Sequence, residues 1–113
     1  MAALDRAMEV IPATTVPHEY YTGSLDIAAS YVQLGHPEKA TPILVALGDR
    51  AGEYAEWYLS GTDSQLRGNV NNCYLELSIL NEVAKLLEDK DLANHYQAML
   101  DDKFTRLRLR MGR

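Results

Sequence analysis

The fold is decided by residues 28–40, which have the sequence AASYVQLGHPEKA. Gly35 tolerates the left-handed backbone conformation in which many helices end. Pro37 suits the first position of a helix, where its missing N–H costs no hydrogen bond. Residues 28–40 therefore predict the end of one helix, a short turn, and the start of a second helix that packs back against the first.

Apolar residues on both sides of this turn recur at intervals of three and four, which is the spacing of helices and not of strands. The spacing predicts four helices, over about 24–34, 37–59, 69–87 and 91–109. Ser24 is expected to cap the first helix, and Thr62, Asp63 and Ser64 supply capping oxygens after the second. Gly48 and Gly52 predict a bend or a close helix contact within the second helix.

The chain has 113 residues, of which 47% are hydrophobic, and this suits one domain with one core. We expect an all-α fold of antiparallel helical hairpins, tetratricopeptide-like but irregular, with about four main helices. The single domain over 1–113 would comprise a short N-terminal helix and connector (1–21), a first hairpin (22–61) and a second hairpin (62–113). Pro12 and Pro17 are expected to hold the connector extended, because proline disfavours helix in the residue before it.

Charge is distributed unevenly along the chain. All 16 acidic residues precede Lys103, together with six of the 11 basic residues, so the last eleven residues are purely basic in charge. An acidic body argues against a nucleic-acid partner. The basic end fits a helix C-terminus best, with anionic lipid or an acidic neighbour as the alternatives. The longest apolar run, 43–47, is too short to insert into a membrane.

No catalytic, cofactor-binding or metal-binding residues are predicted. His18, His36 and His95 lie far apart in the sequence, without a second ligand at helical spacing. Cys73 is the only cysteine and falls on the apolar face of the third helix, where no activating base is indicated. Glycine-rich phosphate loops are also missing from the sequence. The chain is therefore not expected to be an enzyme, and the solvent-facing or capping interpretation of the histidines is preferred.

Aromatic residues are the weak candidates for partner binding. Tyr54, Trp57 and Tyr58 stand at i, i+3 and i+4 of the second helix, and Tyr20 and Tyr21 are able to fold onto them. Such a cluster can stack on a sugar or anchor a peptide. The competing interpretation, core packing with hydroxyls at the edge, is the preferred one.

The stretch 28–40 resembles the middle of a tetratricopeptide repeat. A small residue, a tyrosine, a turn glycine and a close-packing alanine stand at Ala28, Tyr31, Gly35 and Ala40. A degraded second copy would place Ala84, Glu88 and Ala93 at matching positions. That copy lacks the turn glycine and lies 53 residues from the first, whereas a regular array repeats after about 34. The resemblance implies hairpin packing without a regular solenoid.

Residues 4–12 and 16–21, with the sequences LDRAMEVIP and VPHEYY, resemble the soluble C-terminal region of large bacterial multi-pass membrane proteins. These proteins have a glycosyltransferase-like membrane portion. The resemblance implies an accessory domain, with any catalytic residues upstream and with a tether to the inner membrane on its extracytoplasmic side. The protein's localisation depends on that parent and is otherwise open.

Two functions follow as hypotheses. The first is a non-catalytic protein-interaction or scaffold module that binds a protein partner or a second copy of itself. Its concave side would be lined by Asp26, Ser30, Gln33, Glu76 and Asn81. The alternative is a carbohydrate-binding accessory domain of a membrane glycosyltransferase, with glycan contact at the aromatic cluster.

The hairpin motif also makes a prediction about stability. Ala40 is expected to pack between the first two helices, so Ala40→Leu should damage the fold by overpacking. Leu109 lies in the basic end, which is expected to fray. Leu109→Ala should therefore cost less than Ala40→Leu.

Overall fold

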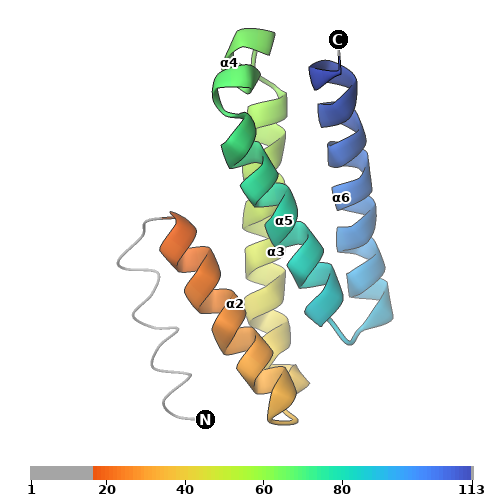
Figure 1. Ribbon diagram of the computed structural model, residues 1–113. Helices are drawn as coiled ribbons and strands as arrows, with labels where there is room; N and C mark the ends of the chain where they lie inside the picture. The colour runs from red at the N-terminus through yellow and green to blue at the C-terminus, as the bar shows by residue number, and fades with distance from the viewer. Residues whose placement is uncertain (1–16, 113) are drawn as a thin grey trace.

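The computed structural model describes residues 17–112 and the side chains from Tyr21 onward (Figure 1). The described residues form five helices: α2 (Pro17–Gln33), α3 (Pro37–Leu59), α4 (Asp63–Gly68), α5 (Val70–Leu86) and α6 (Lys90–Met111). No strand occurs within residues 17–112. The expected all-α fold of antiparallel hairpins is confirmed, whereas the repeat character of the hairpins stays a prediction.

The long helices run alternately up and down, as Figure 1 shows, and α3 is the central one. It packs against α2, α5 and α6, while α5 and α6 also pack against each other. The described chain is flat, with extents of 48 × 32 × 15 Å. The core therefore lies along α3, where Leu44, Leu47, Ala51 and Ala55 are buried.

The turn between α2 and α3 has the predicted geometry. Gly35 has a φ of +82°, the left-handed conformation that favours glycine. The His36 N–H donates to the Tyr31 carbonyl oxygen at 2.8 Å, and the Gly35 N–H donates to the Val32 carbonyl oxygen at 3.1 Å. This pair of bonds is the Schellman motif that ends many helices. Ala28, Tyr31 and Ala40 are all buried beside the turn.

The start of the first hairpin differs from the sequence expectation. α2 begins at Pro17, so residues 17–21 are helical and not an extended connector. A proline at the first helical position loses no hydrogen bond, and it disfavours helix only in the residue before it, so a helix that begins at Pro17 is compatible with both properties. Ser24 lies in the middle of α2 and is fully buried, so it does not cap the helix. The short N-terminal helix and Pro12 fall outside the described residues.

The connection between the hairpins contains a helix that the apolar spacing did not predict. α4 begins with a capping box, in which Thr62 Oγ1 accepts from the Gln65 N–H at 3.1 Å. Gln65 Oε1 accepts in return from the Thr62 N–H at 2.8 Å. Thr62 is therefore the capping residue among the three expected candidates. α4 packs Leu66 into the core, which fixes the course of the chain from α3 to α5.

The two glycines of α3 mark its contact with α6. A Cβ at Gly48 would lie 2.5 Å from Tyr96 Cε1, and a Cβ at Gly52 would lie 2.5 Å from Met99 Sδ. The Tyr96 hydroxyl donates to Asp49 Oδ1 at 2.7 Å. Of the two expectations for these glycines, close helix contact is the one observed.

The basic end of the chain is held in place, so the expectation that it frays is wrong. Arg106 binds both carboxylate oxygens of Glu56, at 2.8 and 2.7 Å. Arg110 donates to the carbonyl oxygens of Leu59 and Gly61 and to Asp63 Oδ1. These arginines extend α6 to Met111 and fasten it to the C-terminal end of α3. Within residues 17–112, no helix has both the length and the apolar character needed to cross a membrane.

Candidate functional site

The aromatic cluster of α3 lies at the surface and at the edge of the core. Trp57 has an exposed fraction of 67%, Tyr54 is also exposed, and Tyr58 is half-buried. The preferred interpretation, that the cluster packs in the core, is therefore wrong for Trp57 and Tyr54. The buried stripe of α3 runs through Leu44 and Ala51, and a turn of about 100° per residue places Trp57 nearly opposite that stripe.

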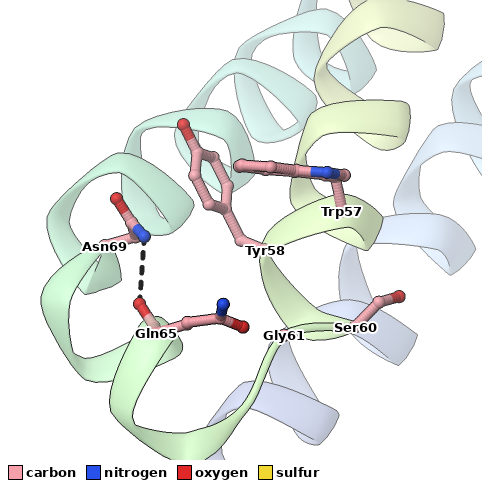
Figure 2. A pocket seen from close by; sticks show the side chains of 6 residues that line it. All are labelled: Trp57, Tyr58, Ser60, Gly61, Gln65 and Asn69. Carbon is pink, nitrogen blue, oxygen red and sulfur yellow. Dashed lines mark hydrogen bonds between the residues drawn. The ribbon is translucent and has the colours of Figure 1, made fainter.

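Trp57 stands at the mouth of a recess of about 330 Å³ at the end of α3 (Figure 2). Its ring meets the Tyr58 ring edge-on, with centroids 5.2 Å apart and an interplanar angle of 67°. Six residues line the recess: Trp57, Tyr58, Ser60, Gly61, Gln65 and Asn69. As Figure 2 shows, they come from the end of α3, from α4 and from the junction between α4 and α5. We call this site the Trp57 recess.

The amide groups of the recess are fixed by bonds to the backbone. Gln65 Oε1 takes part in the capping box, and Asn69 Nδ2 donates to the Gln65 carbonyl oxygen at 3.0 Å. Burial raises the pKa of the Tyr58 hydroxyl, with a further contribution from the charge of Glu76, so Tyr58 stays neutral at physiological pH. The lining thus combines an indole, a phenol and two oriented amides, without a carboxylate, histidine, lysine or thiol. Stacking and hydrogen bonding are the interactions that it offers.

Tyr21 lies outside the recess, although the sequence grouped it with Trp57. It is buried, and its hydroxyl donates to the Glu76 carboxylate on α5. The Arg50 guanidinium carbon lies 5.8 Å from the Tyr21 ring centroid and 5.3 Å from that of Tyr54. Tyr21 is therefore a structural residue that joins α2 to α5. Tyr20 lies in α2, but its side chain is outside the described part of the chain.

Glu76 is also misplaced by the sequence analysis, which expected it on an open concave surface. It is buried, and this burial raises the pKa of its carboxyl group, while the Tyr21 hydroxyl and Arg50 offset part of that rise. We refer to these two residues as the Tyr21–Glu76 pair. Of the other expected surface residues, Asp26 and Gln33 are exposed, and Ser30 and Asn81 are half-buried.

The other titratable side chains that the structure describes are core, capping or surface residues. Cys73 is fully buried, and this desolvation raises the pKa of its thiol, as expected for a small core residue. His36 Nδ1 lies 3.2 Å from Glu38 Oε1 at the first turn, and His95 is exposed against Tyr96. The side chain of His18 is outside the described part. Among the side chains that the structure describes, no three His, Cys, Asp or Glu residues gather as a metal site would require.

One surface was missed by the sequence analysis. Phe104 falls at the three-and-four spacing of the apolar residues over 91–109, yet it has an exposed fraction of 39%. The adjacent Lys103 is buried in its place, because its Nζ lies 3.7 Å from Glu56 Oε1 across the α3–α6 contact. Phe104 instead lies beside the exposed Tyr74 of α5, with ring centroids 6.5 Å apart. The sequence indicated this surface only weakly, because Tyr74 directly follows the core residue Cys73.

Comparisons of the chain with protein-family models, with curated proteins and with solved structures found no match.

Proposed function

We propose that this chain is a non-catalytic protein-interaction module that holds a partner protein at the Trp57 recess. The observation that carries this proposal is the exposure of Trp57 beside a recess with fixed polar groups. Tryptophan and tyrosine are the residues that most often anchor protein interfaces, because they bury a large area with few rotatable bonds. A partner side chain packed between Trp57 and the amides of Gln65 and Asn69 would bury both kinds of surface together.

The rigidity of the surrounding backbone supports a binding role. Arg110 holds the carbonyl oxygens of Leu59 and Gly61, which flank the recess. Arg106 and Lys103 hold Glu56, the residue directly before Trp57. Because these groups are ordered before any partner arrives, binding would cost little conformational entropy.

Photo-crosslinking tests the proposal without requiring a known partner. A photoreactive residue at position 57 should capture a specific protein in cells that contain this chain. The same residue at position 34 is the matched control, because Leu34 is also a large exposed apolar residue but lies at the opposite end of α3. Equal adducts from both positions, or a purified candidate that binds Trp57→Ala as tightly as the wild type, would contradict the proposal.

We further propose that the module is an accessory C-terminal domain of a larger bacterial membrane protein, tethered on the extracytoplasmic side. This proposal rests on the resemblance of residues 4–12 and 16–21 to such a family, and the comparisons add no support to it. Gene context tests it directly. An open reading frame that continues upstream into membrane-spanning segments is expected, and a complete frame that begins at Met1 would contradict it.

Carbohydrate binding is the second candidate function. The observation in its favour is that an exposed indole, a phenol and two amides share one recess, since sugars are bound by ring stacking together with polar groups. Trp57 is the only tryptophan, so glycan titration monitored by its fluorescence reports on this site alone. An unchanged emission spectrum across a broad glycan panel would eliminate this candidate and leave protein binding.

A further inference from the structure

A second apolar surface lies along the seam between α5 and α6, and it shares no residue with the Trp57 recess. Tyr74 and Phe104, with exposed fractions of 44% and 39%, stand over a groove whose floor includes Leu77 and Leu100. Asp101 lines the groove near one end, and Arg108 lies near the other. We call this surface the α5–α6 face and define it by Tyr74, Leu100, Asp101, Phe104 and Arg108.

The charges of α6 differ sharply between its two sides. On the side that faces α3, Lys103 and Arg106 both contact Glu56, and Arg110 contacts Asp63. These cations are neutralised within the chain. The groups that stabilise this side are therefore not available to a second molecule.

On the outer side of α6, two opposite charges lack an ion-pair partner among the described residues. Asp101 Oδ1 accepts a hydrogen bond from Gln97 at 3.0 Å, but no described basic group forms a salt bridge with it. The Arg108 guanidinium lies over the Phe104 ring, 5.9 Å from its centroid, and no described carboxylate forms a salt bridge with it. Within the part of the chain that the structure describes, Asp101 and Arg108 thus have no ion-pair partner and can pair with groups of a second molecule.

The order of these residues makes the face complementary to itself. Asp101 precedes Phe104 by three residues and Arg108 follows it by four, so the three side chains share one stripe of the helix. When two copies of α6 cross antiparallel about a two-fold axis beside Phe104, Asp101 of each copy lies opposite Arg108 of the other. A two-fold interface requires this reciprocity, in which residue i meets j and j meets i.

We propose that two copies of this chain form a symmetric dimer through the α5–α6 face. Phe104 and Tyr74 would fill the centre, and two Asp101–Arg108 ion pairs would form the polar rim, as in other protein interfaces. The α5 and α6 helices of both copies would then pack as a four-helix arrangement. The dimer goes beyond the proposed partner binding, because each copy keeps its own Trp57 recess outside the α5–α6 face.

Charge reversal distinguishes this dimer from a general hydrophobic association. Sedimentation equilibrium at low salt should find a dimer for the wild type. Asp101→Arg and Arg108→Asp should each weaken it by about tenfold or more, since every rim pair becomes repulsive. The double variant with both changes should recover most of the lost affinity, because the reversed charges pair again. Phe104→Glu should yield a monomer, since two carboxylates would meet at the axis.

Matched controls separate dimer loss from misfolding. Trp57→Ser and Leu34→Ser alter exposed apolar residues outside the α5–α6 face and should leave the dimer intact. Circular dichroism should show that the charge variants, which alter exposed positions, keep their helices. A monomeric wild type at high micromolar concentration would overturn the proposal, as would a dimer that persists in both single charge variants. Failure of the double variant to recover would also overturn the antiparallel pairing.

Discussion

The Tyr21–Glu76 pair, which joins α2 to α5, and the Trp57 recess at the end of α3 use aromatic side chains in opposite ways. Tyr21 can be buried because its hydroxyl donates a hydrogen bond to Glu76 of α5. Trp57, by contrast, is exposed at the end of α3. The role of each aromatic residue is therefore set by the helix opposite it. The pair joins α2 to α5, whereas the recess is the proposed binding site for a partner.

The largest expected change in the free energy of unfolding follows from breaking the Tyr21–Glu76 pair. Tyr21→Ala should lower the free energy of unfolding by about 3–5 kcal/mol, because it opens a cavity and leaves Glu76 buried without its donor. Trp57→Ala should lower the same quantity by under about 0.5 kcal/mol, since its side chain is exposed. Urea denaturation of both variants measures the difference. Similar midpoints for the two variants would show that the contrast between the regions is wrong.

A smaller change in the free energy of unfolding is expected from a comparison of the buried Ala40 with the exposed Leu109. Ala40 is buried, so Ala40→Leu should cost about 1–3 kcal/mol by pushing α2 and α3 apart. Leu109→Ala should cost under about 0.5 kcal/mol, now because Leu109 has an exposed fraction of 62% and not because the helix end frays. Chemical denaturation checks the order of the two costs. A less stable Leu109→Ala variant would mean that the first hairpin has been misinterpreted.

The pH dependence of stability sharpens the comparison further. Burial raises the pKa of Glu76 above its ordinary value of 4.5, so the folded state holds this proton more tightly than the unfolded chain. The stability associated with the protonated form is complete below pH 4.5 and is lost as the pH rises through the folded-state pKa. Glu76→Gln removes this loss. The stability of Glu76→Gln relative to wild type should therefore increase from pH 4 to pH 7.

Thermal or urea unfolding at several pH values measures the difference in stability between Glu76→Gln and the wild type. Glu56 provides a matched control, because its hydrogen bond from Arg106 lowers its pKa. The stability that Glu56 contributes should be lost as the pH falls, which is the opposite direction. A constant difference between Glu76→Gln and wild type across the range would contradict a raised pKa for Glu76.

The fold was predictable where its signals were local. Pro37 and Gly35 specify the first turn by their own backbone geometry, and the bounds of α3 follow from the prolines and glycines around it. The start of α2 was missed because Pro17 suits both the beginning of a helix and an extended connector. Local sequence gives no means of choosing between these two conformations.

The candidate site was predictable only as a set of aromatic residues. Glu76 was expected on an open concave side, and its burial depends on Tyr21, which lies 55 residues away in the sequence. Phe104 follows the helical spacing of the apolar residues in its helix, and its exposure follows from the pairing of the adjacent Lys103 with Glu56. Such pairs between distant segments decide which face of a helix is covered, and spacing along one helix does not encode them.

The most direct test of the division between fold and site measures binding and unfolding on the same variants. It requires the partner captured by crosslinking at position 57 and uses Trp57→Ala and Tyr21→Phe. We expect Trp57→Ala to weaken binding by about tenfold or more with an unchanged unfolding midpoint. Tyr21→Phe should lower the midpoint and leave the affinity of the folded protein unchanged. Wild-type affinity in Trp57→Ala, or weakened binding in folded Tyr21→Phe, would contradict the account.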